Sequence, residues 1–300
     1  MAKELKQAIV EEWVKLVSGI FQTKDIWAEL GIATPQNKTY LRVILNRMEA
    51  QGTIVKLDRN GLYRKRDGDL IPMDWQSADT EHTVPLVLPF DIHKYAKIYP
   101  KSIIIVAGEK NSGKTSLLYE IIKLNMNKFT IDLFNSETGR EQMKERFAPL
   151  DIPKPAPFNT YERYDTFSDV VHPEHLSVID YLDLNSEVYL VGTEIDAIFR
   201  KLTTGIAIIG LQKPPATVIY GKNGEKKSYS RDLAYGGAFT AKRAVLYISL
   251  GQNICKLVYV KTPAQKTLNP DNMMWSYSFD NNGYFTNIQR YYGENQASQR

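Results

Sequence analysis

The chain has 300 residues, of which 43% are hydrophobic and 24% charged, a balance typical of a globular protein and not of a disordered one. No apolar run approaches the roughly 18 residues that span a bilayer, and the amino-terminal MAKELKQAIVEEW is not typical of a signal peptide. The single cysteine, Cys255, excludes an internal disulfide and a thiolate metal cluster. We therefore expect a cytoplasmic protein of a bacterial, archaeal or virus-infected cell, with no membrane partner.

The charge is unevenly distributed along the chain. Residues 1–66 contain 12 Lys and Arg against 7 Asp and Glu, a net charge of +5, whereas the remaining residues contain 26 against 27, a net charge of −1. A basic segment joined to a nearly neutral body is typical of a nucleic-acid-binding domain attached to a second domain.

The pattern of residues 1–66 predicts three helices followed by a β-hairpin. Apolar residues recur at helical spacing from Lys3 to Val17, a short second helix follows with Thr23 as its N-cap, and TPQNKTYLRVILNRMEAQG predicts the third. The β-prone runs TIVKL and LYRKR are joined by DRNG, whose Asn-Gly pair favours a tight turn. This order of elements is that of a small winged helix-turn-helix (α+β) domain.

The basic residues of this domain predict contact with duplex DNA. In a winged helix the third helix enters the major groove and the hairpin contacts phosphates. The candidate contacts are Asn37, Lys38, Thr39, Arg42, Asn46 and Arg47 on the third helix and Lys56, Arg59, Arg64 and Lys65 on the hairpin. Two alternatives stay open, because winged helices also dock other proteins and basic residues also solvate a surface.

A polar stretch without sustained periodicity, residues 67–84, predicts a linker. Beyond it, apolar runs such as SIIIVAG and GIAIIGLQ alternate with helical patterns such as SLLYEIIKLN, which predicts βα units and a mainly parallel sheet covered on both faces. The runs AVLYISL, CKLVYVK and WSYSFD are expected to extend the sheet with antiparallel strands. We therefore expect an α/β domain over residues 85–280 and a polar tail over residues 281–300.

Residues 108–116, GEKNSGKTS, match the P-loop pattern G-x-x-x-x-G-K-[ST] between a predicted strand and a predicted helix, the context that this motif requires. In such a loop, backbone N–H groups and the helix N-terminus bind phosphates, the lysine reaches the β and γ oxygens, and the hydroxyl contacts Mg²⁺. The sequence therefore predicts a nucleoside triphosphate site with Thr115 as a metal ligand. Its residues are Gly108, Glu109, Lys110, Asn111, Ser112, Gly113, Lys114, Thr115 and Ser116.

Two acidic residues lie where buried strands are expected to end. Asp180 follows the apolar run of LSVIDYLDL and is the candidate carboxylate beside the metal, whereas Asp183 is interpreted as a helix cap or a solvated acid. Glu137 follows FTIDLFN, at the sheet edge where phosphates are expected. On its own, a glutamate in this position is ordinarily a helix-cap residue.

These motifs, in this order, resemble those of the RecA-like branch of P-loop ATPases, close to the DnaB-type helicase core and its KaiC-like relatives. The resemblance covers about residues 85–280 and rests on the P-loop and on segments similar to family motifs, FNSETGREQMKERF, VIDYLDL, IAIIGLQKP and SRDLAYGGAFTAKRAVLYISL. It implies that Lys114 contacts phosphate, Glu137 is the catalytic glutamate, Asp180 is the Walker B aspartate and Gln212 senses the γ-phosphate. It also implies hydrolysis of ATP with Mg²⁺ between subunits of a homo-oligomer, expected to be a hexamer.

The resemblance places a DNA-facing loop after Gln212. The basic residues of this loop are Lys213, Lys222, Lys226, Lys227 and Arg231, and two tyrosines are interspersed among them. Positive charge with aromatic rings suits single-stranded DNA passing through a central channel. A flexible, solvated hairpin is the alternative.

A departure from the family pattern concerns the contact between subunits. The helicase relatives carry a lysine and an arginine two residues apart on a late strand, which reach the neighbouring subunit's site. Lys261 matches the lysine, but Pro263 stands where the arginine is expected. Either Lys266 substitutes for it or hydrolysis is slow, since a missing arginine finger costs about 10³-fold or more in related enzymes.

The sequence thus predicts an ATP-driven DNA motor, a helicase or translocase of the phage or plasmid type in replication or recombination. The alternative is an ATP-dependent DNA-binding switch for recombination, partition or regulation, which assembles on duplex DNA without unwinding it. A small-molecule kinase fits less well, because Gln212 and the basic loop would have no role in it.

Overall fold

The structure, a computed structural model, describes residues 5–17, 19–57, 61–68, 70–182, 190–220 and 226–293. The chain divides into two compact units, Met1–Ala78 and Asp79–Arg300, and the boundary falls inside the expected linker. Among the described helices, none combines the length and the apolar character needed to cross a bilayer.

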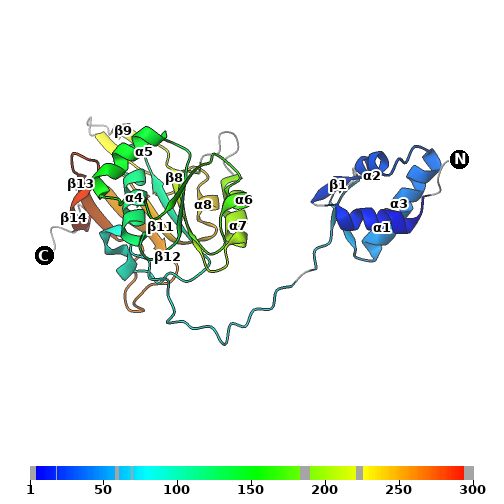
Figure 1. The fold of residues 1–300 in the computed structure, drawn as a ribbon, viewed down its shortest axis with the longest axis horizontal. Coiled ribbons are helices and arrows are strands. Elements are labelled where there is room, and N and C mark those ends of the chain that lie inside the picture. Colours follow the sequence, from blue (N-terminus) through cyan, green and yellow to red (C-terminus); the bar gives the residue numbers. More distant parts are fainter. Residues whose placement is uncertain are drawn as a thin grey trace. The chain divides into compact units, whose positions relative to one another are not determined.

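Helices and a small antiparallel sheet form the amino-terminal unit (Figure 1). Its elements are α1 (Gln7–Leu16), β1 (Ile20–Gln22), α2 (Thr23–Glu29), α3 (Pro35–Ala50), β2 (Ile54–Lys56) and β3 (Leu62–Lys65), with the strand order β1-β3-β2. Val10 and Val14 of α1 share a core with Leu41 and Ile44 of α3. The expected helices and hairpin are present, and the winged-helix assignment stays a prediction.

Two local details of this unit differ from the expectation. β1 spans only Ile20–Gln22, which is too short to leave a periodic signal in the sequence. The helix α2 starts at Thr23 itself, because its N-cap is Gln22. The Gln22 side chain accepts the Asp25 backbone N–H, and the Asp25 side chain accepts the Gln22 backbone N–H, which together form a capping box.

Among the described residues, the larger unit is built around a nine-stranded sheet. Its strands are β4 (Ser102–Gly108), β5 (Ile131–Asn135), β6 (Asn159–Glu162), β7 (Leu176–Asp180), β8 (Ile206–Gln212), β11 (Ala244–Leu250), β12 (Ile254–Val260), β13 (Met274–Phe279) and β14 (Phe285–Tyr291), in the order β14-β13-β12-β11-β4-β8-β7-β5-β6. Neighbours from β11 to β6 pair in parallel, and β12, β13 and β14 add antiparallel pairs. The expected α/β class with a mainly parallel sheet is confirmed.

Helices cover both faces of this sheet (Figure 1). One face carries α4 (Lys114–Asn125), α5 (Arg140–Phe147) and the short 3₁₀ segments η1 (Pro89–Lys94) and η2 (Ala148–Leu150), and the other carries α6 (Phe167–Val170), α7 (Leu190–Lys201) and α8 (Ala238–Ala241). Successive strand residues face opposite sides, so in β4 Ile104 and Val106 join the core with α4 while Ile103 and Ile105 join the core with α7. Burial on both faces explains why β4 is an unbroken apolar run.

The sheet continues beyond its expected end at residue 280. β14 lies within the segment expected to be a polar tail, and it pairs with β13 from Met274↔Tyr291 to Phe279↔Phe285. Its sequence, FTNIQRY, is polar because this is the edge strand of the sheet, and most of its residues are exposed or half-buried.

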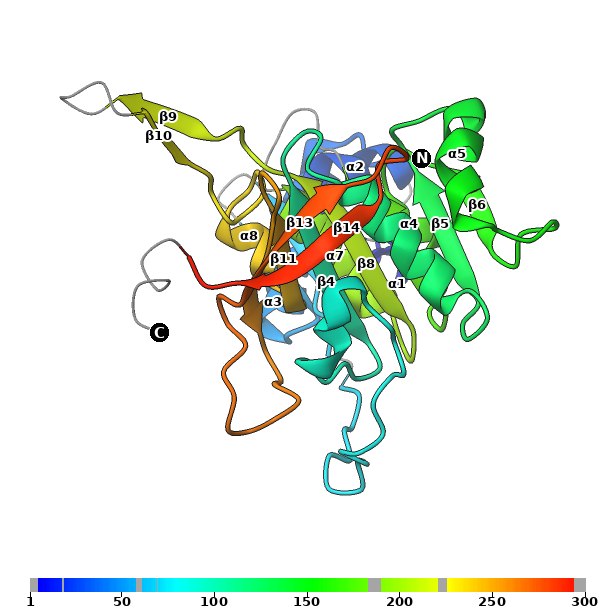
Figure 2. The same cartoon turned by 90° about the vertical axis from the view of Figure 1, so that its left-hand side faces the viewer.

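β9 (Thr217–Tyr220) and β10 (Lys226–Tyr229) form a separate antiparallel hairpin between β8 and α8. The hairpin projects from the body of its unit (Figure 2). It begins five residues after the end of β8, so its base lies near the carboxyl end of that strand.

Candidate nucleotide-binding site

The P-loop connects the carboxyl end of β4 to the start of α4, as expected. Gly113 precedes the helix with φ +85°, a conformation that favours glycine, and a Cβ there would lie 2.6 Å from the Phe279 ring. A Cβ on Gly108 would lie 2.6 Å from the Ser112 hydroxyl, which itself donates to the Glu109 carbonyl at 2.9 Å. The loop is therefore closed tightly, and the N–H groups of the first turn of α4, which have no acceptor within the helix, are placed where an anion can bind.

Lys114, Thr115 and Asp180 come together although β8 lies between their strands in the sheet. The Thr115 hydroxyl donates to Asp180 Oδ1 at 3.3 Å, and Lys114 Nζ lies 3.7 Å from the centre of the Tyr181 ring. Burial raises the pKa of Asp180 to about 6, against the attraction of Lys114, which lowers it, and with the nearby charge of Glu137, which raises it. An additional cation at this position would stabilise the ionised carboxylate.

The residues present fit a Mg²⁺ ion. Asp180 Oδ2 is buried and has no hydrogen-bond partner among the residues that the structure describes, although Oδ1 of the same carboxylate accepts from Thr115. A hydroxyl beside a buried carboxylate is the oxygen donor set that Mg²⁺ uses in P-loop sites, so Thr115 and Asp180 would hold the ion. When bound, Mg²⁺ supplies positive charge next to the phosphates. Asp183, interpreted above as a helix cap or a solvated acid, lies outside the described residues.

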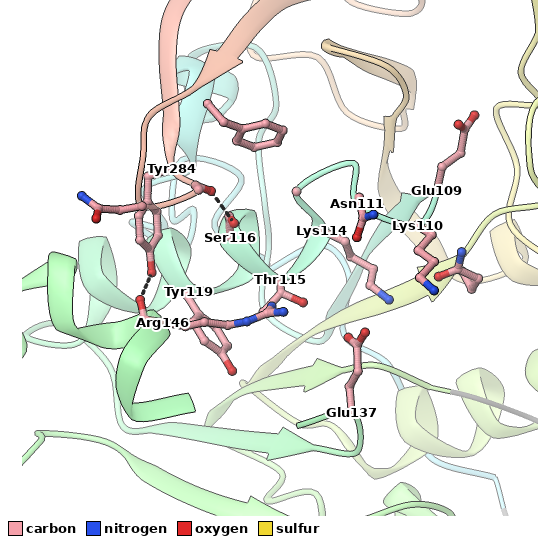
Figure 3. A pocket seen from close by; sticks show the side chains of 15 residues that line it. Glu109, Lys110, Asn111, Lys114, Thr115, Ser116, Tyr119, Glu137, Arg146 and Tyr284 are labelled. Atoms are coloured by element: carbon pink, nitrogen blue, oxygen red, sulfur yellow. Dashed lines mark hydrogen bonds between the residues drawn. The ribbon is translucent and has the colours of Figure 1, made fainter. Parts of the chain in front are cut away.

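Glu137 shares one pocket with the P-loop (Figure 3), and Gln212 also lines this pocket. Glu137 follows the end of β5 and Gln212 is the last residue of β8, so both lie at the carboxyl edge of the sheet. The pocket has a volume of about 420 Å³. It is lined by Glu109, Lys110, Asn111, Gly113, Lys114, Thr115, Ser116, Tyr119, Glu137, Arg146, Gln212, Phe279, Asn282, Gly283 and Tyr284. A carboxylate positioned there can accept a proton from water, and an amide can bond to a phosphate oxygen.

Arg146 is a pocket residue that was not predicted from the sequence. It lies in α5, and its guanidinium points toward Thr115 (Figure 3). Its positive charge also lowers the pKa of Asp180. REQMKERF has the composition of a solvated helix, so no local signal distinguishes this arginine from its neighbours.

The turn between β13 and β14 forms another part of the pocket that was not expected. The Ser116 hydroxyl donates to the Gly283 carbonyl at 2.7 Å, and the Tyr277 hydroxyl donates to the Ser112 carbonyl at 2.8 Å. The Tyr284 hydroxyl donates to the Arg146 carbonyl. The carboxyl-terminal strand pair is therefore bonded to the P-loop, to α4 and to α5.

The candidate duplex contacts in the amino-terminal unit lie largely at its surface. Arg42, Arg47 and Arg64 are exposed, and Lys38 lies with its ammonium 4.6 Å from the centre of the Trp27 ring. Arg59 lies outside the described residues.

The candidate single-strand contacts have different surroundings. Arg231 is exposed after β10, and the backbones of Lys226 and Lys227 pair with those of Tyr220 and Ile219 in β9. Lys213 instead is buried: its ammonium donates to the Ser249 hydroxyl at 2.8 Å and to the Leu250 carbonyl at 3.1 Å. Lys213 is therefore not presented at the surface as a DNA contact, and Lys222 lies outside the described residues.

Lys261 follows β12 at the end of the sheet opposite the P-loop, because Val260 pairs with Leu246 whereas Leu250 pairs with Gly108. Its side chain is exposed, as is that of Lys266, and neither lines the pocket of its own chain. Pro263 forms an isolated bridge with Ala96.

No protein-family model and no curated protein matches this sequence. Solved structures with a similar fold include the RadB recombinase, 11% identical with a TM-score of 0.41, where the match covers 64% of this chain and 94% of that one. A DnaB-like replicative helicase is 12% identical with a TM-score of 0.47 and coverages of 71% and 66%. The flagellar accessory protein FlaH from Methanocaldococcus jannaschii is 12% identical with a TM-score of 0.40 and coverages of 66% and 92%. Likeness at this level carries no information about activity, which is therefore inferred from the pocket.

Proposed function

We propose that this chain is a Mg²⁺-dependent ATPase of the RecA-like kind. The observation that carries the proposal is the convergence of side chains from separate parallel strands on one pocket: Lys114, Thr115, Glu137 and Gln212 line it, and Asp180 bonds to Thr115. Phosphoryl transfer to water needs little else, because positioning and charge stabilisation supply most of the catalysis.

Each of these residues has a chemical role in the proposal. Lys114 holds the β and γ phosphate oxygens, and Thr115 with Asp180 holds the metal. Glu137 accepts a proton from the attacking water, and Gln212 bonds to the γ-phosphate and responds to its loss. Arg146, whose guanidinium points toward Thr115, adds positive charge on the same side of the pocket.

We further propose that hydrolysis acts on DNA. The β9–β10 hairpin begins five residues after Gln212, carries Lys226 and Lys227, and is followed by the exposed Arg231. Single-stranded DNA would lie against this hairpin inside a homo-oligomer, expected to be a hexamer, and duplex DNA would bind the basic α3 of the amino-terminal unit. Such a protein is a helicase or translocase of replication or recombination.

A second candidate is an ATP-dependent switch that assembles on duplex DNA without unwinding it. It is favoured by Pro263, which stands where the helicase pattern has an arginine and which pairs with Ala96 instead. Without that cation from a neighbouring subunit, hydrolysis is expected to be slow, unless Lys261 or Lys266 acts in its place.

The test is the ATPase rate of the full chain with Mg²⁺, with and without single-stranded DNA, together with strand separation on a forked duplex. For the motor, DNA raises the rate severalfold, Lys227→Ala removes most of this increase, and Lys128→Ala, at an exposed lysine beyond α4, keeps it. Duplex binding with a rate indifferent to single strands and no unwinding supports the switch. No hydrolysis by the wild-type chain under any of these conditions overturns both.

A further inference from the structure

Glu109, the second residue of the P-loop, is not directed at the catalytic groups. Its carboxylate points away from Thr115 and Glu137 (Figure 3), and only 11% of its side chain is exposed. Its backbone shapes the loop, because its carbonyl accepts from both the N–H and the hydroxyl of Ser112. Neither phosphate binding nor catalysis therefore explains the contacts of the Glu109 carboxylate.

One partner is Lys213, at the entry to the β9–β10 hairpin. Its ammonium lies 4.0 Å from Glu109 Oε1 and donates to the Ser249 hydroxyl and the Leu250 carbonyl. Its backbone N–H donates to the Gly108 carbonyl at 2.9 Å. Burial lowers the pKa of the Lys213 ammonium, and the Glu109 carboxylate opposes that shift. A buried lysine with this set of acceptors has little freedom to move.

The other partner is Ser230, at the exit from the same hairpin. The Ser230 hydroxyl donates to Glu109 Oε1, the same oxygen that Lys213 approaches. Two residues later, Asp232 forms an ion pair of 2.7 Å with Lys256 of β12. One carboxylate of the P-loop thus lies near residues at both ends of the β9–β10 hairpin. Beyond these residues the chain is anchored to the sheet, by β8 before Lys213 and by the Asp232–Lys256 ion pair after Ser230.

We propose that Glu109 is a positioning residue that couples the phosphate-binding loop to the β9–β10 hairpin, through Lys213 at the hairpin's entry and Ser230 at its exit. This inference rests on the proposed DNA-dependent ATPase. The triphosphate brings several negative charges to the loop that carries the Glu109 carboxylate, so the position of that carboxylate differs between the nucleotide-bound and nucleotide-free states. Because Lys213 and Ser230 contact this carboxylate, both ends of the β9–β10 hairpin move with it.

Coupling of this kind is reciprocal and measurable as a ratio of affinities. The experiment measures the dissociation constant of the full chain for a fluorescent oligo-dT strand, with Mg²⁺, in the presence and absence of a non-hydrolysable ATP analogue. The ratio of the two constants is the coupling factor. Typical allosteric coupling corresponds to a factor of about 5 to 150.

The decisive variant is Ser230→Ala, at an exposed position outside the pocket, which removes only the hydroxyl bonded to Glu109. It is expected to reduce the coupling factor about fivefold or more, while the affinity without nucleotide stays within about twofold of wild type. Ser230→Thr, which keeps a hydroxyl, restores the factor. Arg231→Ala, at the neighbouring exposed cation, weakens DNA binding in both states and leaves the factor unchanged.

A wild-type factor close to one, or a wild-type factor retained in Ser230→Ala, overturns the coupling while leaving the ATPase intact. If the wild-type chain binds no single-stranded DNA, the proposed DNA dependence fails, and the coupling fails with it. If DNA binds but ATP is not hydrolysed, the ATPase fails separately, and the coupling factor measured with the analogue still decides the role of Glu109.

Discussion

The two walls of the nucleotide pocket are built in different ways. The phosphate wall consists of polar and charged groups at the ends of parallel strands and the start of α4, namely Lys114, Thr115, Glu137 and Gln212. The second wall, the hairpin wall, comes from the turn that joins the antiparallel strands β13 and β14 and not from the β9–β10 hairpin. It contains Phe279, Asn282, Gly283 and Tyr284. In the proposed function, the first wall supplies the groups that act on the phosphate. The second supplies aromatic rings and hydrogen bonds that hold the first wall in shape.

This contrast leads to a kinetic expectation. Removal of a group that acts only in the transition state lowers kcat. Removal of a group that supports binding equally in the ground and transition states raises KM instead. Substitutions in the phosphate wall are therefore expected to change kcat, and substitutions in the hairpin wall are expected to change KM.

The largest effect is expected for Glu137→Gln, which keeps the shape of the side chain but removes its basicity. Loss of a general base costs about 10² to 10⁴ in rate, so kcat should fall by at least about 100-fold with KM changed little. Steady-state ATPase kinetics measure both constants. Glu141→Gln, at an exposed residue of α5 paired with Arg140, is the control and should keep the wild-type rate. A fall of less than about tenfold would remove Glu137 from the chemistry.

Gly113→Ala tests the place where the two walls meet. The new Cβ would lie 2.6 Å from Phe279 and 2.9 Å from Phe285, on a residue with φ +85°. Left-handed strain alone costs about 1–3 kcal/mol, so the free energy of unfolding should fall by at least that amount. Urea unfolding measures it. Gly283→Ala is the matched control for stability, because Gly283 has φ +83° and its Cβ would meet no atom within 4 Å. Equal stability of the two variants would show that the hairpin wall does not press on the P-loop.

The phosphate wall could be predicted from the sequence because each of its residues is attached to a local signal. Lys114 and Thr115 belong to a motif of fixed spacing, Asp180 and Gln212 end buried strands, and Glu137 follows one, although the roles of Glu137 and Gln212 came from the resemblance to the family motifs. Parallel strands bring their carboxyl ends to one edge, so residues far apart in the sequence meet there. The buried strands of the sheet were predictable because burial on both faces leaves unbroken apolar runs, as in β4.

The hairpin wall could not be predicted, because nothing local distinguishes it. β14 is a polar edge strand whose place depends on pairing with β13, and Arg146 reaches the pocket only through the packing of α5. Lys213 was predicted to contact DNA because the resemblance places a DNA-facing loop after Gln212, but its ammonium is buried and its acceptors Ser249 and Leu250 come from β11. Each of these features is fixed by contacts between distant segments.

Tyr284→Phe should change KM and leave kcat nearly intact. The substitution removes the hydroxyl that donates to the Arg146 carbonyl and keeps the ring. A net hydrogen bond contributes about 1 kcal/mol, so we expect KM for ATP to rise about fivefold. Tyr164→Phe, at a ring that is 60% exposed and bonded to Glu162, is the control and should leave KM unchanged. A fall in kcat larger than the rise in KM would mean that this wall also acts in the transition state.

The smallest effect is expected for Glu120→Gln, and it should depend on pH. Glu120 accepts the N–H of Phe285 at 3.3 Å, and burial, together with the charge of Asp280, raises its pKa from 4.5 to about 7. The folded state therefore holds a proton that the unfolded state has released, so stability falls as the pH rises from about 4.5 to about 7. Glutamine does not titrate, so the variant should be more stable than wild type by up to about 1 kcal/mol at pH 8, with most of this difference absent at pH 5, as urea unfolding at the two pH values would measure. A difference that is equal at both pH values, or reversed at pH 8, would mean that the Glu120 carboxyl is not neutral when it holds β14 against α4.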